Sequence, residues 1–115
     1  MQPKLTESEG AGLLLEEFVR AGLAIRPGHP LQVGGTVVLL DGYDPERRVG
    51  FEFITAEAGD RKSYTKEVLA ALEEKVSRGE AFLLLVDEWE VDDAEELRIA
   101  ARRFLETLRS RRVLP

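Results

Sequence analysis

Two carboxylates, Asp41 and Glu52, stand where a β-hairpin would bring them together. A four-residue turn over 44–47 would place Asp41 opposite Gly50, with Glu52 diagonal to Asp41 on the same face, because side chains alternate along a strand. Diagonal neighbours lie about 7 to 8 Å apart at their backbones. Paired carboxylates at this separation can bind Mg²⁺, which takes few protein ligands and retains several waters. The spacing therefore predicts a divalent-cation site.

A purely structural explanation also accounts for Asp41 and Glu52. Asp41 would end one strand and enter a turn, where Asp is common, and Glu52 would face solvent on the returning strand. A shift of one residue in the pairing would also send Glu52 to the other face of the sheet. The two hypotheses therefore differ in whether Asp41 and Glu52 share one face.

A second acidic segment spans residues 87–96 and contains the single tryptophan, Trp89. Its last aspartates can cap the helix that follows, and its last glutamates complement the positive end of that helix. The functional alternative is a docking surface for a basic partner, with Trp89 as an aromatic anchor. Trp89, Glu88 and Glu90 are the predicted partner-binding residues.

The residue types present exclude several other sites. The chain of 115 residues has no cysteine and one histidine, so it lacks the ligands of a structural zinc site and has no thiol nucleophile. That histidine, His29, lies in the Pro/Gly-rich stretch 26–30, which we expect to be a solvated loop. No serine lies in a nucleophile-elbow sequence, and Gly34-Gly35 lacks the lysine and hydroxyl of a phosphate-binding loop. The lack of these catalytic motifs in the sequence favours a protein that is not an enzyme.

Charge and hydropathy narrow the class of partner. The formal net charge is −6, and an acidic domain repels the phosphates of nucleic acids. The last predicted helix carries a flank of mixed charge, typical of a solvated face, formed by Arg98, Arg102, Arg109, Glu95 and Glu106. No apolar stretch approaches the roughly 20 residues of a membrane span. We expect no membrane partner and a cytoplasmic location.

Apolar periodicity and capping signals predict three helices. The first begins at a capping box over Thr6 to Glu9 and reaches Ile25. The second spans about 64–78 and ends at Gly79, and the last spans about 92–111. In the last helix, one face is predicted to be buried and Arg103 to be exposed opposite it; the buried face consists of Leu97, Ala101, Phe104 and Leu108.

The strands complete the predicted fold. The hairpin would consist of strands over 36–41 and 48–55, and residues 31–33 would add a short strand before it. The apolar run 81–86 predicts a strand buried on both faces at the centre of the sheet. The chain is therefore expected to be one globular domain, residues 1–115, of α/β or α+β class. Its three- to four-stranded mixed sheet would be flanked by three helices, in the order α, (β), β, β, α, β, α.

This order, with Asp41 on one strand and Glu52 on the next, resembles the core of the PD-(D/E)XK nuclease superfamily over roughly residues 6 to 86. The resemblance implies Mg²⁺ bound by the two acids and metal-dependent cleavage of nucleic acid. The superfamily's lysine should come two residues after the second acid, where this chain has Ile54. Lys62 and Lys66 are the lysines nearby, and Lys66 would take the catalytic role. Without a cation, charge that develops on a phosphate lacks a partner.

We therefore expect a small soluble accessory or protein-binding domain without catalytic activity or cofactor, whose partner is a protein. A homo-oligomer is left open. The alternative is a divalent-metal-dependent nuclease-like domain of PD-(D/E)XK type, active or inactive, in which Asp41 and Glu52 bind Mg²⁺ and Lys66 completes the site. Metal binding separates these two hypotheses.

Overall fold

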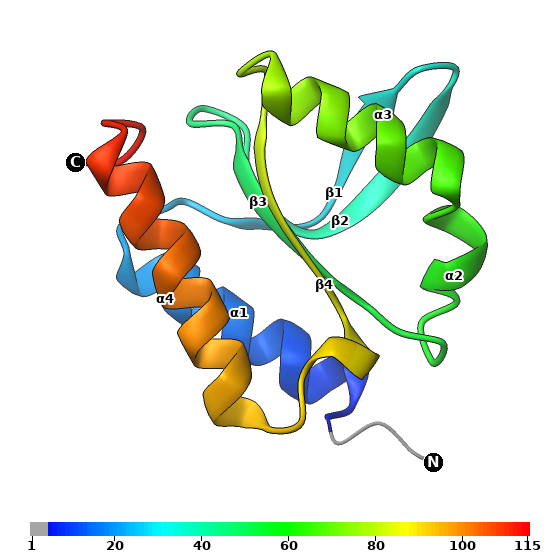
Figure 1. The fold of residues 1–115 in the computed structure, drawn as a ribbon, viewed down its shortest axis with the longest axis horizontal. Helices are drawn as coiled ribbons and strands as arrows, with labels where there is room; N and C mark the ends of the chain where they lie inside the picture. Colours follow the sequence, from blue (N-terminus) through cyan, green and yellow to red (C-terminus); the bar gives the residue numbers. More distant parts are fainter. Residues whose placement is uncertain (1–4) are drawn as a thin grey trace.

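The computed structural model describes residues 5–115, and Figure 1 shows their arrangement. Four strands form one sheet in the order β1-β2-β3-β4: β1 (Arg26–Val33), β2 (Thr36–Asp44), β3 (Val49–Ile54) and β4 (Phe82–Asp87). The first three strands are antiparallel neighbours, and β4 runs parallel to β3. This mixed sheet confirms the predicted class and the predicted order of elements.

Helices cover both faces of the sheet. One face carries α1 (Glu7–Arg20) and α4 (Ala94–Ser110), which lie side by side, and the other carries α3 (Lys66–Ser77). The short helix α2 (Asp60–Ser63) precedes α3, and the 3₁₀ turn η1 (Glu88–Glu90) follows β4. The predicted second helix over about 64–78 corresponds to α3, which begins where Thr65 accepts a hydrogen bond from the Val68 N–H. The short helix α2 lies before the predicted range. Within residues 5–115, no helix is both long and apolar enough to cross a membrane.

The core between α1, α4 and the sheet follows from the amphipathic face of α1. Leu14 and Phe18 are fully buried, and the Phe18 ring lies 4.8 Å from that of Phe51 on β3. The predicted capping box at Thr6 is present. The expectation that this helix reaches Ile25 is wrong, because Gly22 takes a φ of +95°, which ends the helix soon after Arg20.

The last helix has most of the predicted apolar face: Leu97, Ala101 and Leu108 are buried, and Arg103 is exposed. Phe104, which was also predicted to be buried, is only half-buried at the margin of the core. Its charged flank is only partly solvated. Arg98 and Arg102 donate hydrogen bonds of 3.0 and 3.1 Å to Glu17 of α1, which is buried. The hydrogen bond from Arg102 lowers the pKa of Glu17, so the carboxylate keeps its charge.

The prediction of a loop over 26–30 is wrong, because this stretch forms the first part of β1. β1 lies at the edge of the sheet, where proline is tolerated, and it contains Pro27 and Pro30. His29 pairs with Leu40 of β2, and its half-buried ring lies 5.1 Å from the ring of Tyr43. His29 is therefore not a solvated loop residue.

The prediction that residues 81–86 form a central strand is also wrong. β4 lies at the edge of the sheet, and most of its residues are half-buried rather than buried. Its apolar run has a different cause: Phe82 and Leu84 pack toward α1 and α4, while Leu83 and Leu85 pack toward α3. Cover on both faces makes a strand apolar throughout, whether or not both of its edges are paired.

Candidate functional site

The pairing of β2 with β3 differs from the predicted register by two residues. Tyr43 pairs with Gly50 and Gly42 with Phe51, so Gly50 does not lie opposite Asp41. The shift arises because Asp44 stays in the strand and its carboxylate accepts hydrogen bonds from the N–H groups that open the loop. A shift of two residues preserves the face of every side chain, so Asp41 and Glu52 still share one.

Beyond the Gly42–Phe51 pair, β2 and β3 diverge (Figure 1). Hydrogen bonds place the two carboxylates between the strands. The Asp41 N–H donates to Glu52 Oε1 at 2.7 Å, and the Phe53 N–H donates to Asp41 Oδ2 at 2.8 Å. Side chains thus provide the acceptors that a backbone ladder would supply. Glu52 is 1% exposed, so the alternative that placed it facing solvent is wrong.

Two further carboxylates join this pair, and sequence analysis had not identified either. Glu7, at the start of α1, accepts a hydrogen bond of 2.8 Å from the Thr55 hydroxyl, and its carboxyl meets that of Asp41. Asp60, at the start of α2, accepts one of 3.0 Å from the Thr55 N–H and meets Glu52. These four residues are called the carboxylate cluster below. No sequence signal placed α1 beside β2.

The cluster holds protons at neutral pH. Burial, followed by the charges of Asp41 and Asp60, raises the pKa of Glu52 to about 10. Burial also raises the pKa of Glu7 to about 7, although the Thr55 hydrogen bond opposes it, and burial raises the pKa of Asp41. Two carboxyl groups can share a hydrogen bond only if one is protonated. The cluster is therefore partly neutral rather than a site of four negative charges.

We expect the free energy of unfolding to fall as the pH rises from about 5 to 9. Folded Glu52 keeps a proton up to a pKa of about 10, but the unfolded chain releases it near the ordinary glutamate pKa of 4.5. The folded state binds more protons in this window, so its advantage is full at low pH and is lost as pH rises. One such group contributes a slope of roughly 1.4 kcal/mol per pH unit.

Urea unfolding at a series of pH values measures this slope in the wild type and in Glu52→Gln. The amide imitates a protonated carboxyl, since it can accept from the Asp41 N–H and has no proton to release. We expect a shallower slope and a higher stability at pH 9 in the variant. An identical slope in both proteins would contradict the raised pKa of Glu52.

The cluster in this arrangement does not fit a metal ion. Within residues 5–115, no three Asp, Glu, His or Cys side chains are placed to hold one. The reason is visible in the hydrogen bonds, because one oxygen of each carboxylate already accepts from a donor of the chain. A cation would have to displace or reorient these groups.

The lysine that the nuclease resemblance implies has no counterpart that forms an ion pair with the carboxylate cluster in the described part of the chain. Ile54 is buried against α3, with its neighbours in the apolar core on that face. Lys62 and Lys66 are exposed, and in the described part of the chain neither forms an ion pair with the four carboxylates. Arg61 instead binds Asp87 at 2.7 Å and Glu88 at 2.9 Å. The structure thus brings Asp41 and Glu52 together without Lys66.

The three predicted partner-binding residues have different environments. Glu88 is buried, and it accepts hydrogen bonds from Arg61 and from the Ala56 N–H. Trp89 is 51% exposed, and Glu90 is exposed with one oxygen accepting from the Asp87 N–H. Trp89 and Glu90 therefore lie on the surface, whereas Glu88 holds the end of β4 in place.

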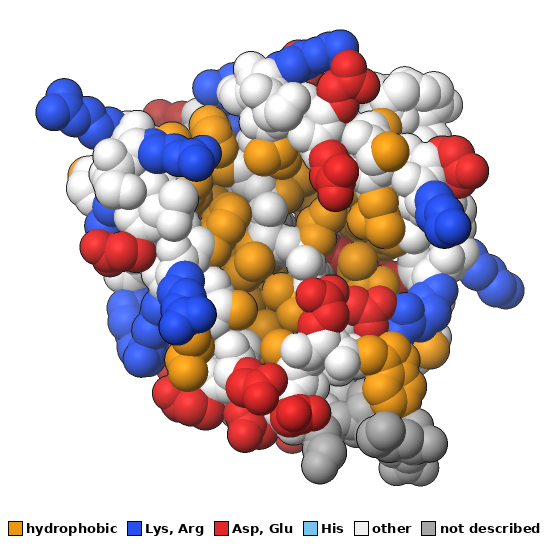
Figure 2. Space-filling model, viewed as in Figure 1, with side chains coloured by type: hydrophobic (Ala, Val, Ile, Leu, Met, Phe, Trp, Pro, Cys, Tyr) orange, Lys and Arg blue, Asp and Glu red, His pale blue; other side chains and the backbone are white. Residues whose placement is uncertain are grey.

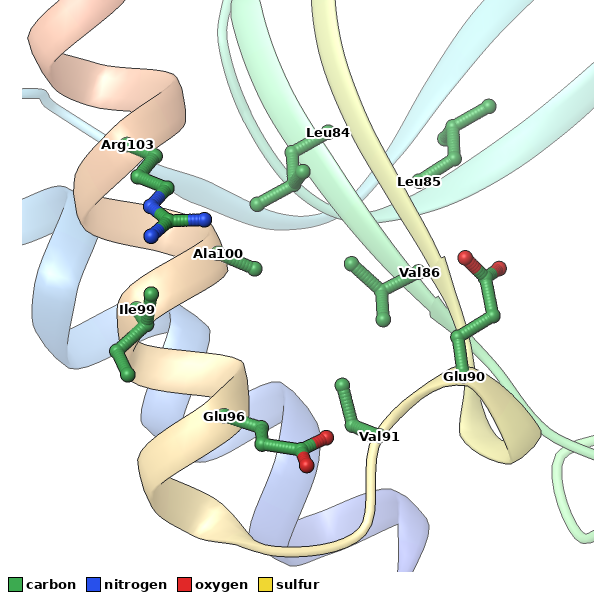
Figure 3. A pocket seen from close by; sticks show the side chains of 9 residues that line it. All are labelled: Leu84, Leu85, Val86, Glu90, Val91, Glu96, Ile99, Ala100 and Arg103. Carbon is green, nitrogen blue, oxygen red and sulfur yellow. The ribbon is translucent and has the colours of Figure 1, made fainter.

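A hollow lined by apolar side chains runs along β4, between α4 and α3 (Figure 2). On one side, a groove of about 490 Å³ separates β4 from α4; we call it the α4 groove (Figure 3). On the other, a groove of about 390 Å³ separates β4 from α3; we call it the α3 groove. Ile99 and Val76, which line the α4 and α3 grooves, are 40% and 37% exposed.

Comparison of the chain with protein-family models, with curated proteins and with solved structures finds no significant match.

Proposed function

We propose that this chain is a small, non-catalytic, cytoplasmic domain that acts by binding another protein through the edge of β4. The observation that supports this proposal is the apolar hollow, in which an unpaired strand edge lies between two grooves. Exposed edges of apolar strands readily pair with other chains, so proteins usually cover, charge or shorten them. Within residues 5–115, no strand pairs with this edge and no charged residue lies between Leu83 and Val86.

The carboxylate cluster supports the non-catalytic part of the proposal. Its hydrogen bonds join α1, β2, β3 and α2, so each acid has a structural role at the point where two strands diverge. The position of the superfamily's lysine is occupied by Ile54, which contributes to the core instead of to a phosphate site. Arg61 is held by two carboxylates and contributes to the junction of α2 with β4.

A photo-crosslinking residue tests the binding surface. We expect benzoyl-phenylalanine in place of Ile99 to give one defined protein adduct in cells, because Ile99 lines the α4 groove. The same residue in place of Val19, which is 52% exposed on α1, is the control and should give none. With the captured protein purified, amide exchange at Leu83 and Leu85 should slow in the complex. Adducts from both positions, or from neither, would contradict the proposal.

The second candidate function is a divalent-metal-dependent, nuclease-like domain of PD-(D/E)XK type. The specific observation in its favour is that Asp41 and Glu52 meet on one face and that Glu7 and Asp60 join them. Four neighbouring acids, of which Glu52 is buried and the other three are half-buried, repel one another when ionised, and a cation would relieve that repulsion. The raised pKa values of Glu7 and Glu52 are therefore consistent with protons or with a cation at this place.

Thermal unfolding with Mg²⁺ or Mn²⁺ separates the two functions. We expect millimolar metal to leave the Tm unchanged, because one oxygen of each carboxylate already accepts a hydrogen bond from the chain and a cation would have to displace it. A bound cation at 100 times its Kd would instead add about 2.7 kcal/mol. That gain should vanish in Asp41→Asn and Glu52→Gln. Metal-dependent cleavage of DNA or RNA that both substitutions abolish would establish the second function in place of the first.

A further inference from the structure

We propose that the occupant of the β4 edge is an extended segment of a partner protein, apolar along its length and basic at its end, which adds to the sheet as a fifth strand. This inference rests on the proposed function, because it names the kind of partner for the same edge. The backbone, the shape of the hollow and its charges each support it.

The backbone of β4 offers two residues for such pairing. The Phe82 N–H donates to the Arg48 carbonyl at 2.8 Å, and Phe82, Leu84 and Val86 alternate as the residues bonded to β3. The N–H and C=O groups of Leu83 and Leu85 therefore point away from the sheet. The next outward N–H, that of Asp87, is already taken by Glu90. A segment of about five residues is enough to satisfy this edge.

The shape of the hollow favours a single strand over a second folded domain. β4 lies at its floor with α4 and α3 on either side (Figures 1 and 2). A strand lies about 4.8 Å from its neighbour, whereas packed helices need about 8 to 10 Å between axes. A second copy of this chain that paired through β4 would bring its own two helices against these. An extended segment has no helices and can send alternate side chains into the two grooves.

The charged residues around the hollow indicate which side chains the bound segment should carry. At the end of β4, the α4 groove is bordered by Glu90 and Glu96, and Arg103 lies at the other end beside Leu84 (Figure 3). The α3 groove adds Glu73. Carboxylates thus outnumber the guanidinium around an apolar floor, on a chain whose net charge is −6. A segment with a basic residue beside Glu90 and Glu96 complements this pattern.

Two synthetic peptides test the inference on the full chain. The probes are acetyl-Lys-Val-Thr-Val-Leu-Val-Lys-amide and its counterpart with glutamates at both ends, and binding is followed by fluorescence and by amide exchange. We expect the lysine-ended peptide to bind at least tenfold more tightly than the glutamate-ended one. Binding should protect the amides of Leu83 and Leu85, and a proline at the centre of the peptide should abolish it.

Variants of the chain locate the binding. Ile99→Asp should weaken the lysine-ended peptide at least tenfold, whereas Val19→Asp, a matched change on α1, should not. Glu96→Gln should reduce the preference for lysine. The inference is overturned if neither peptide binds, if both substitutions act equally, or if the chain forms dimers that protect Leu83 and Leu85 without peptide. Failure of the peptides while Ile99 still crosslinks a protein would overturn this inference alone; loss of both results would overturn the proposed function as well.

Discussion

We expect Phe18→Ala to lower the free energy of unfolding by about 3 to 5 kcal/mol, because it removes a fully buried ring from the core between α1 and the sheet. The ring contacts Phe51 at 4.8 Å and Phe104 at 5.8 Å, so the cavity would lie where β3, α1 and α4 meet. A domain of this size has a total stability of roughly 5 to 15 kcal/mol. The loss is therefore a large fraction of the whole.

The control for Phe18→Ala is Leu15→Ala, on the same helix but 38% exposed. It should cost clearly less, because Leu15 is already partly exposed to water and lies outside the core cluster that contains Phe18. Urea unfolding at one pH measures both. Equal losses from the two substitutions would mean that α1 buries a different face from the one described.

Gly10→Ala should destabilise the fold by about 2 kcal/mol, although alanine is the better helix former. A Cβ on Gly10 would lie 2.3 Å from two carbons of the Phe53 ring, far inside contact distance. Overpacking typically costs about 1 to 3 kcal/mol, and a clash this close belongs at the upper end, which leaves a net loss after the roughly 1 kcal/mol gained in helix propensity. Gly12 provides the matched control, because its Cβ would meet nothing within 4 Å.

Gly12→Ala should therefore stabilise the chain by up to about 1 kcal/mol, so the two alanines should shift thermal unfolding in opposite directions. Gly10 also sets how closely α1 approaches β3, and Glu7 lies one turn before it on the same helix. We expect Gly10→Ala to separate Glu7 from Asp41 and to change the pH dependence of stability. If both alanines were stabilising, the contact of α1 with Phe53 would be wrong.

Several helix ends and the shared face of two strand residues were predicted correctly, because they depend on residues close together in the sequence. The capping box at Thr6 and the glycine at position 79, which has a φ of +71°, mark helix ends in the structure as they do in the sequence. The shared face of Asp41 and Glu52 also followed from local alternation, and it survived an error in register because that error was an even number of residues.

The errors concern contacts between distant segments. The apolar run of β4 shows that both of its faces are covered, but nothing in the run tells whether a further strand follows. Pro27 and Pro30 indicated a loop because their tolerance depends on β1 being an edge. Glu7 joined the carboxylate cluster only through the packing of α1 on β3, which no local pattern encodes. In each of these cases, the structure depends on how segments distant in the sequence pack together.

The pairing of the first helix with the last constrains the order in which the chain can fold. Glu17 and its partners Arg98 and Arg102 are 81 and 85 positions apart, and α1 shares its core with residues of α4 such as Leu105. During synthesis, α1 leaves the ribosome long before α4 exists. The apolar face of α1 remains partly uncovered until α4 has been synthesised. Assembly of this layer is therefore expected to be a late, slow event dominated by long-range closure.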